Sequence, residues 1–261
     1  MLDSDMASEM ILADILNKEH SVSGLTHSWY YSTELRFLQM QWFYRIGLLL
    51  FPHNWHMARV ISMMLAIALL GFGVWLLFFA TGLRDYGVWA AAFCFFPGGG
   101  WYFFQTLYGG YYLPYILISL FTISLILLLI KEIKLKKKVF YTIMILFLGL
   151  ASGLNGVKQL MVFYVPLIIS ALCILLFEIH TNSERKKLGW DIVREKCFLY
   201  FLFCVSTSLF SGLGYLINSR ILSKMYVFKS YDEYKIQEDS FFGFLKKYIW
   251  SFGYADDKVL L

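Results

Sequence analysis

The chain has 261 residues, of which 59% are hydrophobic, 20% aromatic and only 16% charged. This composition excludes a disordered chain and a collagen-like repeat, and four scattered cysteines do not make a disulfide scaffold. The net charge of +5, from 23 basic and 18 acidic residues, does not indicate a nucleic-acid partner. We therefore expect an all-α, polytopic membrane protein in the cell membrane, with membrane lipids as partners.

Residues 1–56 precede the first long apolar stretch, and we expect them to form an acidic segment with interfacial amphipathic helices. The first such helix is predicted in MASEMILADILNKE, whose apolar residues at helical spacing are Met10, Ile11, Ile15 and Leu16. If it begins at Ser4 or Asp5, then Asp5 and Glu9 share a face, with Asp3 close by. A structural role is also open, because Asp5 could cap the helix and Glu9 could favour its first turn through the helix dipole.

A second amphipathic helix is predicted to begin at Ser32 or Thr33. Its apolar residues recur at helical spacing: Leu35, Leu38, Trp42, Leu49 and Leu50. The aromatic side chains of this segment suit the headgroup region, so we expect the helix to lie in the membrane interface. His53 and His56 then lead into the first span, but two histidines with no acid beside them are a weak metal signal.

Residues 57–217 contain the stretches that can cross a bilayer, and we expect about six crossings. Five of the stretches are long, and they cover residues 57–80, 111–130, 139–154, 160–177 and 197–217. The remaining one, residues 87–96, is short and stops at Pro-Gly-Gly-Gly. This pattern predicts a short helix followed by an irregular turn at membrane depth.

The basic residues of the loops orient these spans. Residues 131–138 hold five Lys and one Glu, and residues 178–196 hold five Lys or Arg, so both loops are predicted to be cytoplasmic. The turn at residues 153–159 then faces outward. On this topology residues 1–56 and 218–261 are both external segments.

An external N-terminal segment needs an apolar helix to carry it across the membrane. We therefore expect such a helix upstream of Met1, and further external sequence after Leu261. The tail 218–261 carries seven Lys or Arg and six acidic residues, which runs against the charge rule, although long loops obey that rule poorly.

The run DSDMASEMILADILNKE, followed by WYYSTELRFLQMQ and a first span, resembles the integral-membrane glycosyltransferases of the C superfamily (GT-C fold). The stretch TLYGGYYLPYI and the hairpin GLNGVKQL are similar to segments that border the lipid-facing cavity in that superfamily. The resemblance implies transfer of a sugar from a polyprenyl-phosphate donor to an acceptor at the external face. The chain is shorter than members of the superfamily, which generally have more spans.

The resemblance also implies catalytic roles for particular residues. A carboxylate removes the acceptor's proton, and a cation stabilises the leaving phosphate. Asp3 or Asp5 is the expected base, and Glu9 orients the acceptor or a metal ion. A divalent cation is an open question, with Asp3, Asp5 and Glu9 as its candidate ligands.

The expected phosphate partners are Arg36 and Lys158, and Tyr111 and Tyr112 are expected to contact the sugar. Lys158 is the only charge in the turn between two spans. Lys158 and the two tyrosines have ordinary alternatives, because a lysine near a span can simply reach the headgroups and tyrosines commonly line the membrane interface.

Two other functions stay open. A transporter or flippase of a lipid-linked substrate would place ionisable groups near the bilayer midplane, and the predicted spans contain almost none. A non-catalytic membrane fragment fits the short length. The sequence does not say which sugar, hexose or pentose, or which acceptor would be used.

Overall fold

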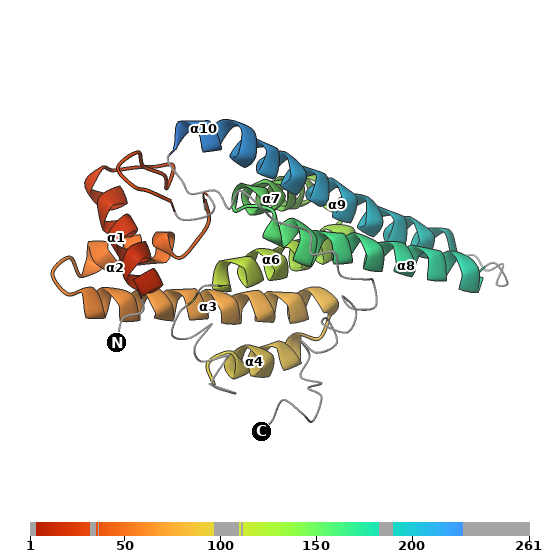
Figure 1. Ribbon diagram of the computed structural model, residues 1–261. Coiled ribbons are helices and arrows are strands. Elements are labelled where there is room, and N and C mark those ends of the chain that lie inside the picture. The colour runs from red at the N-terminus through yellow and green to blue at the C-terminus, as the bar shows by residue number, and fades with distance from the viewer. Residues whose placement is uncertain are drawn as a thin grey trace, which may run out of the picture. The chain divides into compact units, whose positions relative to one another are not determined.

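The computed structural model describes residues 4–31, 35, 37–96, 110, 112–182 and 190–226, with the backbone alone at 4–6, 181–182 and 190–194. Helices make up the regular structure of this part of the chain (Figure 1). Five of its helical segments are long and apolar enough to cross a membrane: Trp55–Thr81, Leu113–Lys131, Leu135–Leu154, Leu160–His180 and Glu195–Met225. The predicted all-α, polytopic architecture is confirmed.

The five segments correspond to the five long stretches predicted from the sequence. They are built from α3 (Trp55–Thr81), α6 (Leu113–Lys131), α7 (Leu135–Leu154), the π-helix η2 (Leu160–Tyr164) continued by α8 (Val165–Asn182), and α9 (Trp190–Ile217) continued by η3 (Asn218–Leu222) and α10 (Ser223–Met225). The first four agree with the predicted bounds to within about five residues. The last is longer than predicted, because its helix starts at Trp190 and continues through η3 and α10 to Met225, past the predicted end at Ile217.

Helix α3 has clear local start and stop signals. The side chain of Asn54 accepts a hydrogen bond from the backbone N–H of Met57 at 3.0 Å and so caps the first turn. At the other end Gly82 adopts a left-handed conformation with φ of 92°, and the N–H groups of Gly82 and Leu83 return to the carbonyls of the last turn. The 27 residues between them form one uninterrupted apolar helix.

The short stretch predicted at residues 87–96 is α4 (Arg84–Phe93). Its ten residues rise about 15 Å, roughly half of a bilayer core of about 30 Å, so this helix does not complete a crossing. It runs antiparallel to α3, because Gly87 lies against Trp75 and Phe78 whereas Phe95 lies against Gly71.

Helices α3 and α6 run parallel. The chain between them therefore returns from the end of α3 to the level of its start. Leu113 lies in the same apolar cluster as Met63 near the start of α3, and the Lys131 ammonium donates to the carbonyl of Ala80 at the end of α3. Gly110 lies against Met63, so the chain that leaves α3 at Gly82 has come back by Gly110. Helix α4 begins this return, and residues 97–109, which follow it, lie outside the described residues, so the sixth predicted crossing stays a prediction.

The N-terminal segment forms α1 (Ser4–Lys18) and α2 (Gln41–Leu50). Helix α1 packs on α2, and α2 packs on the start of α3 (Figure 1). The α1 residues in the core are Met10, Leu12, Ala13 and Leu16, whereas Ile11 is exposed. We call the end of the bundle that carries α1 and α2 the α1–α2 end. The opposite end, which carries residues 131–138, is the lysine end.

The prediction that the second helix starts at Ser32 or Thr33 is wrong. Helix α2 begins at Gln41, and Leu35 lies outside any helix. The physical reason is that distant side chains bind the backbone groups that a helix would use. Asn155 accepts from the N–H of Leu38 at 2.7 Å and donates to its carbonyl at 2.9 Å, and Asn218 donates to the carbonyl of Leu35 at 2.8 Å.

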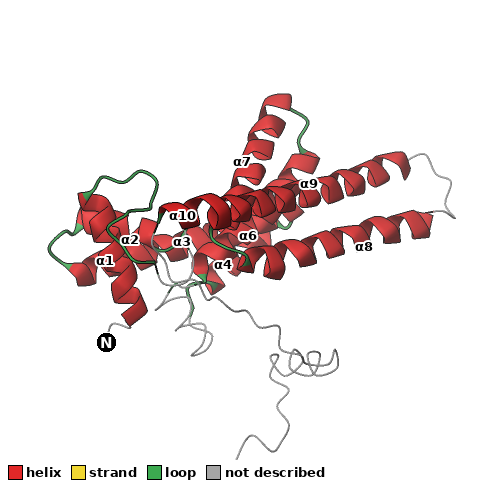
Figure 2. Ribbon diagram, turned by 45° about the horizontal axis from the view of Figure 1, so that its top comes forward, coloured by secondary structure: helices red, strands yellow, loops and turns green. Residues whose placement is uncertain are grey.

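Helices α7 and α9 run parallel and approach closely near the α1–α2 end. A methyl group added at Gly153 would overlap the carbonyl oxygen of Ser211, and one added at Gly214 would overlap that of Leu150. Gly149 lies in the same way against the backbone of Thr207. Small residues at this spacing allow the two backbones to touch, which is a common basis of helix association in lipid. Toward the lysine end the two helices diverge (Figure 2).

Candidate functional site at the α1–α2 end

A carboxylate, a phenol and a guanidinium gather where α1, α2 and α3 meet. Glu9 is half-buried, and its neighbour Met10 lies in the same apolar cluster as Tyr44. Burial raises the pKa of Tyr44, the nearby charge of Glu9 raises it further, and the charge of Arg59 lowers it. Both charged groups are therefore close to the Tyr44 hydroxyl.

The Tyr44 hydroxyl is fully buried and has no hydrogen-bond partner among the described residues. A buried hydroxyl without a partner is costly, at about 1–3 kcal/mol, and such groups are often found where a ligand or water binds. Gln39 is similar, because its side-chain amide is buried and neither its nitrogen nor its oxygen is bonded within the described part of the chain. Gln39 lines a cleft of about 210 Å³ between α2, α3, α6 and α7.

A second feature at this end is an apolar groove of about 410 Å³ between α6 and the η2–α8 segment. Lys158 and Tyr112 both line it, and both are exposed. Most of the other lining residues are apolar: Ile116, Leu120, Ile123, Val162 and Phe163. The groove therefore joins a hydrophobic channel between membrane-spanning helices to a cation in the connecting turn. We call it the Lys158 groove.

Hydrogen bonds hold the turn that carries Lys158. The side chain of Gln159 donates to the carbonyl of Tyr115 at 2.9 Å and to the hydroxyl of Ser119 at 3.1 Å, and it accepts from Ser152 at 3.0 Å. These bonds tie η2 to α6 and α7. Gly156, with φ of 101°, makes the sharp turn between α7 and Lys158. The backbone position of Lys158 is therefore well defined.

The structure describes three of the seven residues predicted for the site. Lys158 and Tyr112 share the groove, and Glu9 lies beside Tyr44 in the separate cluster. The two features occupy the same end of the bundle, since Leu113, next to Tyr112, packs in the same cluster as Met10. Asp3, Arg36 and Tyr111 lie outside the described residues, and so does the side chain of Asp5.

The predicted metal site rests on Asp3, Asp5 and Glu9, of which only the Glu9 side chain is described. Among the described residues no three His, Cys, Asp or Glu side chains gather in a way that could hold a metal ion. His53 and His56 are both exposed.

Sequence reasoning missed Tyr44, Gln39 and Gln159. The signal available in the sequence was a polar residue within an apolar stretch, as for Gln39 and Gln159. That signal does not say which polar side chains will be buried, because burial is decided by the packing of α1, α3 and α6 around them. Comparison of the chain with known protein families, curated proteins and solved structures gave no match.

Proposed function

We propose that the protein transfers a sugar from a polyprenyl-phosphate donor to an acceptor at the α1–α2 end of the bundle. The observation that carries the proposal is the Lys158 groove, which pairs an apolar channel with a lysine at its end. An isoprenoid tail would occupy the channel while its phosphate reaches the Lys158 ammonium. Tyr112, at the same groove, would lie beside the sugar.

The proposed reaction needs a proton acceptor and a stabilised leaving group. The acceptor hydroxyl oxygen attacks the anomeric carbon, the bond from that carbon to the phosphate oxygen breaks, and the phosphate leaves with the electron pair. A carboxylate takes the hydroxyl proton. We assign this step to Asp3 or Asp5, with Glu9 orienting the acceptor, and we assign charge stabilisation on the phosphate to Lys158.

Transport of a lipid-linked substrate is less well supported. The buried polar side chains of the described spans are neutral, and they comprise Ser62, Thr122, Ser124, Ser152, Thr207, Ser208, Ser211 and Asn218. Transporters that couple to ions or move charged groups commonly use ionisable residues at this depth.

A transfer assay on the full chain in liposomes tests the proposal. The liposomes contain labelled polyprenyl-phosphate sugars, and the readouts are the labelled product and the released polyprenyl phosphate. Lys158→Gln should lower transfer by about 10- to 100-fold, because one charged contact to the leaving group is lost. Lys224→Gln is the matched control, since Lys224 is an exposed lysine at the same end that does not line the groove.

Two further measurements separate the assigned roles. The Asp3→Asn, Asp5→Asn double variant should abolish transfer while leaving membrane insertion intact. Crosslinking with a photoreactive polyprenyl phosphate should label the α6 and η2 segments that line the groove. Donor movement across the bilayer without product, or equal transfer by Lys158→Gln and Lys224→Gln, would contradict the proposal.

A further inference from the structure

The lysine end has a charge arrangement that the proposed function does not use. Three consecutive lysines, Lys136 to Lys138, occupy the first turn of α7, and that turn contains no acidic residue. The positive end of the helix dipole disfavours cations at this position, and neighbouring lysines repel one another. An anion close to this turn would relieve both effects.

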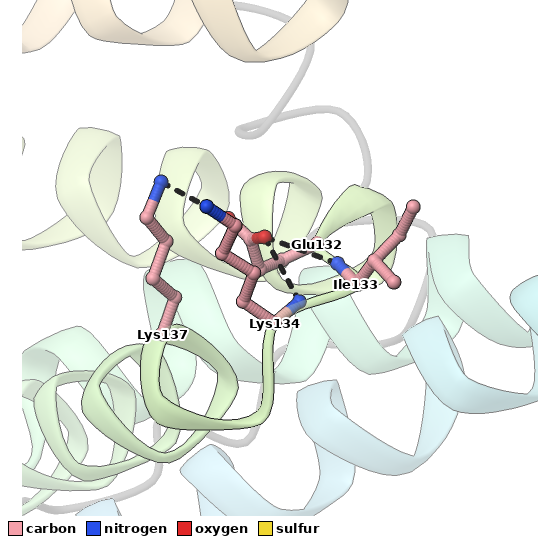
Figure 3. A network of polar contacts seen from close by, with 4 residues as sticks. All are labelled: Glu132, Ile133, Lys134 and Lys137. Atoms are coloured by element: carbon pink, nitrogen blue, oxygen red, sulfur yellow. Dashed lines mark hydrogen bonds and ion pairs between the residues drawn. The ribbon is translucent and has the colours of Figure 1, made fainter.

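The chain itself supplies one compensating charge, Glu132 (Figure 3). Its Oε1 accepts from the N–H groups of Ile133 and Lys134, each at 3.1 Å, and its Oε2 pairs with the Lys137 ammonium at 3.5 Å. Because these contacts engage Glu132, Lys138 is left without an acidic partner among the described residues.

Lys138 lines a groove of about 380 Å³ between α6, α7 and α9. Apart from Lys138 and Thr142 its lining is apolar, with Leu129 and Ile130 from α6, Val139 and Ile143 from α7, and Leu199 and Phe203 from α9. The groove forms where α7 and α9 diverge, on helices long and apolar enough to span a membrane. Lipid chains therefore have direct access to it, and the lysine stands where a headgroup would lie.

We propose that this groove binds one anionic phospholipid, with an acyl chain along α7 and α9 and the phosphate at Lys138. The reason is charge complementarity: an acyl chain suits the apolar lining, and the phosphate supplies the anion that the first turn of α7 lacks. A zwitterionic lipid would place its own cation near the lysines and gain less. The site lies at the opposite end from the Lys158 groove and is independent of sugar transfer.

Native mass spectrometry of the full chain tests this site. The protein is released from detergent in the presence of equimolar dioleoyl phosphatidylglycerol and dioleoyl phosphatidylcholine, and the retained lipids are counted. The wild-type chain should retain phosphatidylglycerol preferentially, and Lys138→Gln should lower that preference about fivefold. Lys136→Gln removes the same charge from the same turn but outside the groove, so it should change the preference less.

A groove-filling variant tests the acyl-chain part of the proposal. Val139→Trp should reduce retention of the phospholipid without changing charge, whereas Leu172→Trp, on α8 outside this groove, should not. Lys138→Arg keeps the charge and should retain the preference, which guards against a folding defect in Lys138→Gln. Equal retention of the two lipids by the wild-type chain, equal effects of Lys136→Gln and Lys138→Gln, or displacement of the lipid by soluble glycerol phosphate would overturn the proposal.

Discussion

The parallel pair α7 and α9 is packed in two different ways along its length. Near the α1–α2 end, Gly149 and Gly153 bring the two backbones into contact. Near the lysine end, the larger residues Ile143 and Phe203 line an open groove between them. The same two helices are thus closed at one end and open at the other, and the size of the facing side chains decides which.

The polar side chains of the two ends also differ, both in their burial and in how far along the chain their bonding partners lie. At the α1–α2 end, Asn155, Gln159 and Asn218 are buried and bond to the backbone of distant segments. At the lysine end, the described charges of the connecting loop are mostly exposed. Glu132 contacts residues close to it in sequence, the N–H groups of Ile133 and Lys134 and the Lys137 ammonium, while Lys131 reaches the carbonyl of Ala80. We infer that the α1–α2 end is a rigid frame for a site, whereas the lysine end is suited to adapting to lipid.

Among substitutions that test this difference between the two ends, we expect the largest loss of unfolding free energy at Asn155. Asn155→Leu removes the hydrogen bonds to the N–H and carbonyl of Leu38 and leaves both half-buried groups without this partner, which should cost about 2–5 kcal/mol of unfolding free energy. The measurement is reversible unfolding in mixed micelles. Asn54→Leu is the matched control, because it removes one exposed cap bond and should cost about 1 kcal/mol. Equal losses in the two variants would show that Asn155 does not fix the α1–α2 end.

A smaller effect is expected where α7 meets α9. Gly153→Ala places a methyl group on the Ser211 carbonyl oxygen, and the required backbone shift should cost about 1–3 kcal/mol. At Gly212 on α9 an added methyl group would meet no atom within 4 Å, so Gly212→Ala should be neutral or slightly stabilising through helix propensity. Thermal unfolding of the two variants in the same detergent compares them. A stable Gly153→Ala protein would mean that the helices are not held by this close approach.

The smallest expected effect is at the lysine end. The N–H of Lys134, then that of Ile133, and finally the Lys137 charge hold the pKa of Glu132 below its ordinary value of 4.5. A lowered pKa in the folded state stabilises the fold above the unfolded value, and that stabilisation is lost as the pH falls through the folded value. Glu132→Gln should therefore change the melting temperature little at pH 7. Below pH 4.5 the wild-type chain should lose a small amount of stability that the variant does not lose. A large destabilisation of Glu132→Gln at pH 7 would instead show that this loop is held as firmly as the α1–α2 end.

The long spans could be predicted because each one depends on its own composition. An apolar stretch of about 20 residues forms a helix in lipid whatever surrounds it, since its backbone groups must be bonded internally. Helices α3, α6 and α7 illustrate this. Helix α4 was predicted as a short element for the same reason. Its antiparallel packing on α3, by contrast, depends on Gly71 and Gly87 facing aromatic side chains.

The candidate site was only partly predictable. Lys158 is conspicuous in the sequence because it is the single charge in a turn, and the structure places it at a groove that also contains Tyr112. The cluster of Glu9, Tyr44 and Arg59 could not be predicted, because these residues come from three helices whose contacts have no local signal. The assigned roles of Asp3, Asp5, Arg36 and Tyr111 stay predictions.

The sequence by itself determined that the chain is helical, that it spans a membrane and where most of its spans begin and end. Those properties follow from hydropathy and from the bonding needs of a backbone in lipid, which act within each segment. Only the tertiary structure decided that Leu35 and Leu38 are held outside a helix, that Tyr44 lies beside Glu9, and that α7 and α9 close at one end and open at the other. These features arise from contacts between residues far apart in the chain, as between Leu35 and Asn218, and no local pattern encodes them.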